Sequence, residues 1–169
     1  LLNVDTAREI WEHCNDLLST DQFSTRGLLK NFNVEVICTT DDPLDSLVNH
    51  KKLREENFEI KIFPAFRPDN AMAVENMNSF KQWLDELQEA TGISISGFNH
   101  FIEAIRKRHD YFHENGCRLS DHGLEVPYSD DYKDEEIHTV FQKILLSKEL
   151  NKNDIIKFIL MPYNYILIL

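Results

Sequence analysis

The sequence lacks most of the short motifs that identify a familiar chemistry. It has no glycine-rich phosphate loop, no Walker motif and no GxSxG segment, so it indicates neither a phosphate cradle of that kind nor a nucleophilic serine. Its three cysteines, Cys14, Cys38 and Cys117, lie far apart and form no CxxC pair. Their spacing indicates neither a zinc knuckle nor a disulfide scaffold, and it fits a reducing cytoplasm.

Positive charge is also scarce. Lys and Arg number 18 against 29 Asp and Glu, which gives a formal net charge of -11. Such a chain repels phosphate backbones, so we expect no nucleic-acid partner. The apolar stretch at 155–169 is too short to span a bilayer, so no membrane association is expected. The sequence starts without a signal peptide or an initiating methionine, and we expect it to begin inside a longer protein.

What the chain does contain is a repeated unit, in which a short strand ends in polar residues. At 169 residues it is long enough for one domain with a real core. We expect strands from residue 33 to about 40, over 58–66 and within 116–124, because these stretches favour extended backbone. Active sites of parallel barrels form at the carboxyl ends of strands, and these three strands end in Thr39–Pro43, Arg67–Asp69 and Ser120–His122.

Apolar residues at helical spacing occupy much of the remaining chain. They predict helices over 5–18, 24–30, 42–53, 75–90, 98–115 and 137–150, followed by a short helix capped within 151–154. The helix over 75–90 carries an apolar stripe that includes Phe80 and Trp83, and we expect this stripe in the core. The fold class is therefore α/β.

The polar residues at the strand ends have both structural and chemical interpretations. Asp41 or Asp42 can cap a helix that begins at Pro43, and we favour this role over catalysis for at least one of them. Arg67 can form a paired bond to a substrate carboxylate, or a local salt bridge to Asp69. Spacing alone does not decide between the two interpretations of Arg67.

Two further groups on the helix over 98–115 favour a structural interpretation. His109 and His113 share a helix face, as the two zinc ligands of an HExxH motif do, but the glutamate of that motif is missing. The basic run at 106–108 lies in an acidic chain, so we expect it to form a solvated face.

Three segments in order resemble the uronate isomerase (glucuronate isomerase) family. They are Asn33–Leu47, Phe66–Asp69 and Gly116–Leu124. The opening helix and the turn at 23–27 fit the same family. Three motifs in the family's order make a specific match, and the resemblance covers about residues 1–157.

The resemblance implies a partial TIM (β/α)₈ barrel of the amidohydrolase superfamily, with about three parallel strands and flanking helices. Family members interconvert D-glucuronate with D-fructuronate, and D-galacturonate with D-tagaturonate, by moving a proton between C2 and C1. The implied partner is thus a sugar acid in the cytoplasm, and assembly into an oligomer is left open.

The resemblance also assigns roles to single residues. Arg67 matches the family's substrate-binding arginine, and Asp69 belongs to the same motif. Asp121 and His122 match the polar end of a middle strand, and we take them as the catalytic candidates. The complete enzyme is expected to hold a divalent metal, with zinc favoured. The family's metal ligands, a His-x-His pair and an aspartate, lie outside this chain, and His122 is only a weak ligand candidate.

We therefore expect residues 1–157 to be a central fragment of such a barrel, about a third of the enzyme, and residues 158–169 to be an aberrant apolar tail. Three strands of eight cannot close a barrel, so the chain alone should be inactive. Two alternatives remain: a metal-dependent hydrolase of the same superfamily, and a non-catalytic interaction fragment.

Overall fold

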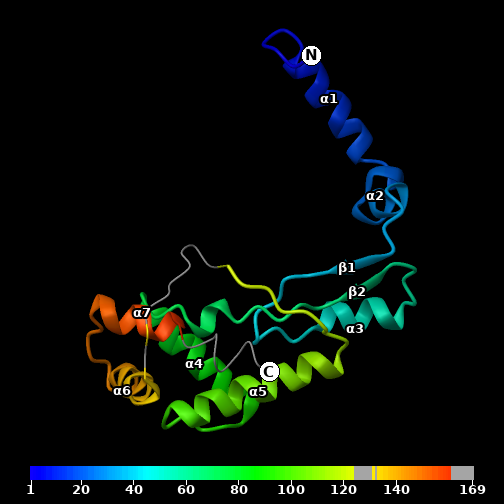
Figure 1. Cartoon of the computed structure of the whole chain (residues 1–169). Helices are drawn as coiled ribbons and strands as arrows, with labels where there is room; N and C mark the ends of the chain where they lie inside the picture. The colour runs from blue at the N-terminus through cyan, green and yellow to red at the C-terminus, as the bar shows by residue number, and fades with distance from the viewer. Residues whose placement is uncertain (124–130, 132, 161–169) are drawn as a thin grey trace.

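The computed structural model describes residues 1–123, 131 and 133–160, and it shows an α/β fold (Figure 1). Helices account for most of this part of the chain, and the strands are short. In chain order the elements are α1 (Ala7–Leu18), η1 (Asp21–Phe23), α2 (Thr25–Asn31), β1 (Val36–Cys38), α3 (Val48–Glu55), β2 (Lys61–Phe63), η2 (Asp69–Ala71), α4 (Met77–Thr91), α5 (Phe98–Glu114), α6 (Asp134–Leu145) and α7 (Lys152–Leu160).

The sheet consists of β1 and β2, which pair in parallel with Ile37 opposite Ile62. Hydrogen bonds extend this pairing beyond the strands, as far as a parallel bridge between Asp41 and Phe66. Phe66 makes a second parallel bridge to Ser120. In the described part of the third expected strand, pairing is thus reduced to a single bridge, but the three segments do run side by side in the predicted direction.

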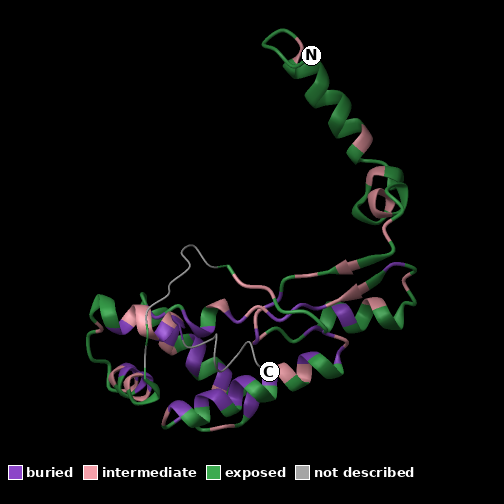
Figure 2. Ribbon diagram, viewed as in Figure 1, coloured by how far each residue is buried: buried purple, intermediate pink, exposed green. Residues whose placement is uncertain are grey.

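The core lies where α4, α5, α6 and α7 pack together, and Figure 2 shows most of the buried residues there. Its centre is a cluster of aromatic rings that are at most 2% exposed. Phe80 and Phe101 lie on the apolar stripes that the sequence predicted for α4 and α5. The rings that pack together are those of Phe80, Phe98, Phe101, Phe141 and Phe158.

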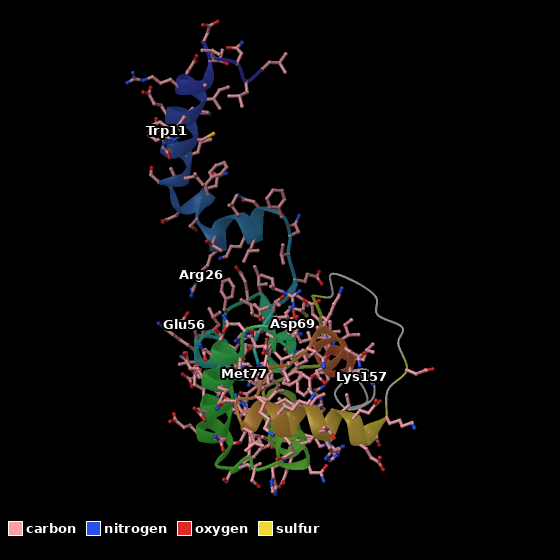
Figure 3. All side chains as sticks on the ribbon, turned by 90° about the vertical axis from the view of Figure 1, so that its left-hand side faces the viewer. Trp11, Arg26, Glu56, Asp69, Met77 and Lys157 are labelled. Carbon is pink, nitrogen blue, oxygen red and sulfur yellow. The ribbon has the colours of Figure 1, made fainter. Side chains whose placement is uncertain are left out.

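The first two helices form an arm that points away from this core (Figures 1 and 2). Neither α1 nor α2 has a buried residue. The apolar stripe expected on the first helix exists, but Ile10 and Leu18 are exposed, and so is the neighbouring Trp11. Figure 3 shows Trp11 on the arm, far from the main body. The spacing of apolar residues therefore predicted the helix correctly, but it could not show whether anything packs against the apolar stripe of α1.

One expectation about local structure was wrong, and another holds for Arg106 and Lys107 but not for Arg108. The helix expected from Asp42 begins instead at Val48, because Leu47 adopts a left-handed backbone with φ of 54°. The basic run at 106–108 is not wholly solvated, since Arg108 is only 8% exposed. The Arg108 guanidinium donates to the carbonyl oxygens of Pro43 and Asp45, so it holds the loop that follows β1.

The chain from 152 to 160 is helical, and its apolar residues are packed. Phe158 is fully buried and Leu160 is 4% exposed. The segment expected to be an apolar tail, 158–169, therefore begins within α7, while its remainder at 161–169 lies outside the described residues. Within the described ranges, no helix combines the length and apolar character that crossing a membrane requires.

Candidate functional site

Polar side chains from three segments meet at one edge of the small sheet. Asp41, Phe66 and Ser120 are linked by parallel bridges, so the chain leaves the sheet at the same edge after each of them. The backbone N–H of Asp121 donates to the Phe66 carbonyl, and that of Arg67 donates to the Asp41 carbonyl. This register places the side chains that follow each bridge next to one another, as expected for the carboxyl ends of parallel strands.

Arg67 lies between two carboxylates. Its Nε is 3.1 Å from Oδ2 of Asp69, and its Nη2 is 3.4 Å from Oδ2 of Asp121. The salt bridge to Asp69 that the sequence left open is therefore present. The Arg67 side chain is still 37% exposed, so the guanidinium can also be reached from solvent. The Thr40 hydroxyl is 3.5 Å from the same oxygen of Asp121.

His122 completes this group from the same segment as Asp121. Its Nδ1 is 4.0 Å from Oδ1 of Asp69, and its side chain is 15% exposed. Burial lowers the pKa of His122, against the raising effect of Asp69 and Asp121. Its Nε2 is buried and has no hydrogen-bond partner among the described residues. The imidazole is thus neutral at neutral pH, with a ring nitrogen that no described neighbour engages.

Gly123 is a site residue whose role the sequence did not reveal. Its backbone N–H donates to both carboxylate oxygens of Asp69. A Cβ at this position would lie 2.8 Å from Oδ2 of Asp69 and 3.3 Å from Nη2 of Arg67. The structural requirement at position 123 is therefore space for these two side chains.

Asp42 has a structural role, although it does not cap a helix. Its Oδ1 accepts hydrogen bonds from the backbone N–H of Leu44 and from Nε1 of Trp83, at 2.8 Å and 3.1 Å. Its Oδ2 accepts from the side-chain amide of Asn70 at 2.8 Å. Asp42 therefore joins the loop after β1 to η2 and α4, and both of its oxygens are engaged.

The remaining histidine pair does not join this cluster. His109 packs edge-on against Phe66, with ring centroids 5.4 Å apart, and burial lowers the pKa of His109. Across the part of the chain that the structure describes, no three His, Cys, Asp or Glu residues are grouped so that they could hold a metal ion. In the site itself, Arg67 and Gly123 already engage the carboxylate of Asp69. The donors present therefore do not fit a bound divalent metal.

The structure thus brings together the four site residues named from the sequence, Arg67, Asp69, Asp121 and His122. It adds Gly123 and Thr40 to them. The first four residues could be predicted because each follows an expected strand at its polar end. The positions of the other two depend on distances between segments that are far apart in sequence. The chemical roles of the four remain predictions.

Comparison with known proteins identifies relatives along the whole described chain. The family model for glucuronate isomerase matches residues 1–166. A uronate isomerase from Bacteroides fragilis is 50% identical over 158 residues, which cover 94% of this chain and 34% of the relative. A uronate isomerase from Cellvibrio japonicus is 47% identical over 159 residues, with the same two coverages.

Two solved structures have a similar fold. The crystal structure of a uronate isomerase from Thermotoga maritima has a TM-score of 0.84 and 30% identity, covering 96% of this chain and 36% of its own. That of a glucuronate isomerase from Caulobacter crescentus has a TM-score of 0.80 and 26% identity, covering 92% of this chain and 32% of its own. The chain therefore spans about a third of the length of the relatives it matches.

Proposed function

Since the chain belongs to the glucuronate isomerase family, we propose that it forms about a third of a (β/α)₈ barrel enzyme that isomerises uronates. The reaction interconverts D-glucuronate with D-fructuronate, and D-galacturonate with D-tagaturonate. One observation carries the proposal: Arg67, Asp69, Asp121 and His122 gather where two of the three parallel segments end. Barrel enzymes place their active sites at this edge.

In this proposal Arg67 and Asp69 bind the substrate. A guanidinium presents a planar fork that matches the two oxygens of a carboxylate, or adjacent oxygens of a sugar chain. The Arg67 side chain is 37% exposed, so it is accessible to a ligand. Asp69 forms an ion pair with the guanidinium, although the buried Nε has no hydrogen-bond partner among the described residues, and Gly123 in turn holds Asp69. The substrate therefore meets an arginine whose direction is already set.

Asp121 and His122 carry the proton in the proposed mechanism. An aldose–ketose isomerisation removes a proton from one carbon and returns it to the adjacent carbon. It therefore needs a base that can accept this proton and then donate it again. The lowered pKa of His122 keeps its imidazole neutral and able to accept a proton at neutral pH. Asp121 lies next to Arg67, and its carboxylate can accept a hydrogen bond from a substrate hydroxyl.

We assign the divalent metal of the complete enzyme, with zinc favoured, to ligands outside this chain. Such an ion polarises a carbonyl or hydroxyl oxygen of the sugar acid. The described residues include no group of three or more His, Cys, Asp or Glu that could hold the ion, so we derive no step through it. The free cysteines of the chain are compatible with a cytoplasmic enzyme.

The test compares this chain with a version extended at both ends to the length of the curated relatives. Both are incubated with D-glucuronate and zinc or manganese, and the formation of D-fructuronate is measured. We expect turnover from the extended protein and none from the 169-residue chain, because three strands cannot close a barrel. Absence of turnover in the extended protein would overturn the assignment, and turnover by the short chain would overturn its inactivity.

A further inference from the structure

A second polar cluster lies next to the candidate site and is more deeply buried. It consists of Thr39, Asp41 and His50, which we name the Thr39 cluster. Asp41 is 9% exposed and His50 is 7% exposed. The Thr39 hydroxyl is 2.6 Å from Oδ2 of Asp41 and 2.7 Å from Nε2 of His50. Asp41 and His50 are therefore joined through one hydroxyl group.

The protons in this cluster can be assigned by counting donors. An ionised carboxylate only accepts, and Oδ2 of Asp41, at 2.6 Å, is a closer acceptor for the single O–H of Thr39 than the Phe63 carbonyl oxygen, at 3.3 Å, so we assign that proton to the bond with Asp41. The Thr39 oxygen then accepts, which requires that Nε2 of His50 carries a proton. In the neutral ring the other nitrogen, Nδ1, is then left with its lone pair. This assignment agrees with the surroundings of Nδ1, which is buried without a hydrogen-bond partner in the described chain.

The Thr39 cluster is connected to the candidate site through Asp41. Oδ2 of Asp41 accepts a hydrogen bond from the backbone N–H of Ala65 at 3.2 Å, and the Asp41 backbone N–H donates to the Ala65 carbonyl at 3.1 Å. The Asp41 carbonyl accepts from the backbone N–H of Arg67 at 2.9 Å. The orientation of Asp41 therefore fixes the backbone at the point where Arg67 leaves the sheet.

From this geometry we propose that Thr39 and His50 are positioning residues for the Arg67 guanidinium. His50 donates to Thr39, Thr39 donates to Asp41, and Asp41 holds the backbone of Arg67. Neither Thr39 nor His50 contacts the substrate in this arrangement. The proposal rests on the proposed function only where it concerns uronate binding, since the hydrogen bonds and the placement of Arg67 can be measured without turnover.

The first experiment is nitrogen NMR on the 169-residue chain, with Thr39→Val as the test variant. In the unaltered chain we expect His50 to show a protonated Nε2 and an unprotonated Nδ1, together with a distinct Nε–H signal from Arg67. Thr39→Val should alter both, and Thr39→Ser, which keeps the hydroxyl, should restore both. Thr91 supplies the control, because its buried hydroxyl donates to the Leu87 carbonyl and accepts from the backbone N–H of Ile93, away from the Thr39 cluster.

Thr91→Val should leave the His50 and Arg67 signals unchanged. An unprotonated Nε2 on His50 would overturn the proposal, and so would an Arg67 signal that is unchanged in Thr39→Val. A merely structural role would instead lower stability in Thr39→Val and Thr91→Val alike and leave the Arg67 signal where it was.

The second experiment measures kinetics in the extended enzyme. Thr39→Val should raise KM for D-glucuronate about tenfold with little change in kcat, the loss expected when one charge-assisted hydrogen bond to the substrate weakens. Thr39→Ser should return KM to its original value. An unchanged KM in Thr39→Val would contradict the proposal. If the extended enzyme without any substitution is inactive, the proposed function is contradicted instead. The NMR result then decides whether Thr39 and His50 position Arg67.

Discussion

The backbone N–H of Gly123 donates to both carboxylate oxygens of Asp69, at 3.2 Å and 3.0 Å, across 54 residues of sequence. This contact joins the segment after Ser120 to η2, in a region where the sheet itself contributes only one bridge. It also fixes the carboxylate that pairs with Nε of Arg67. The geometry of the candidate site therefore depends on a hydrogen bond from a residue without a side chain.

Gly123→Ala tests this dependence. The new Cβ would lie 2.8 Å from Asp69, so the carboxylate must move and lose its contacts with Gly123 and Arg67. We expect kcat/KM of the extended enzyme to fall by at least about tenfold, and the free energy of unfolding to fall by about 1–3 kcal/mol. Gly97→Ala is the control, because among the described residues its Cβ would meet Nε2 of Gln142 alone, at an ordinary contact distance of 3.6 Å. Equal activities of the two variants would show that the contact is dispensable.

Arg67→Lys tests the guanidinium fork. Lysine keeps the charge but cannot contact Asp69 and Asp121 while also presenting paired donors to a substrate. We expect KM for D-glucuronate to rise by about 10- to 100-fold in the extended enzyme. Arg26→Lys is the matched control, since Arg26 pairs with Glu56 at 2.8 Å on the surface (Figure 3). A similar KM for both variants would remove Arg67 from the binding site.

The lowered pKa of His122 predicts a pH effect of definite sign. Because burial depresses the pKa of His122 below its ordinary value of 6.5, the unfolded chain takes up the proton first as pH falls. The contribution of His122 to the free energy of unfolding is therefore fully present above pH 6.5. It is lost as the pH falls through the pKa that His122 has in the folded chain. His109 shifts in the same direction, so it adds to the same loss.

Urea unfolding of His122→Gln at pH 7.5 and pH 5 measures how much His122 contributes to the pH dependence of stability. We expect the variant to lose less stability between these two pH values than the unaltered chain does. His13→Gln, a change on the exposed face of α1, should keep the original pH dependence. An identical loss in His122→Gln and the unaltered chain would mean that burial does not perturb His122.

Phe158→Ala tests whether α7 is part of the core. Phe158 is fully buried, stacks on Phe141 with ring centroids 6.1 Å apart, and meets Phe80 edge-on at 6.0 Å. We expect the free energy of unfolding to fall by about 3–5 kcal/mol. Phe32→Ala is the control, because Phe32 is 76% exposed and its loss should cost less than about 0.5 kcal/mol. If both variants were equally stable, α7 would not belong to the folded core.

Much of the fold could be predicted because local sequence determines it. Apolar residues at helical spacing placed α4 and α5 within two residues of their observed bounds. The start of α3 could not be predicted in this way. The side chains of Asp42 and Asp45 accept hydrogen bonds from nearby backbone N–H groups. These bonds stabilise a loop over 42–46 and compete with the helix that Pro43 favours.

The candidate site was predictable for a different reason. Parallel pairing sets Arg67 and Asp121 at one edge whenever the order of the strands is right. The burial of Arg108 was not predictable, because its partners are backbone carbonyls more than 60 residues away. The role of Gly123 likewise depends on the position of Asp69, to which no local pattern points.

The charges of the candidate site have a consequence for the attraction of a ligand. Arg67 carries one positive charge, Asp69 and Asp121 carry two negative charges, and His122 is neutral at neutral pH. The four side chains together therefore repel an anion at long range, although the arginine binds one at contact. If a uronate is drawn to this site, the electrostatic pull on it has to originate in cations that other parts of the enzyme supply.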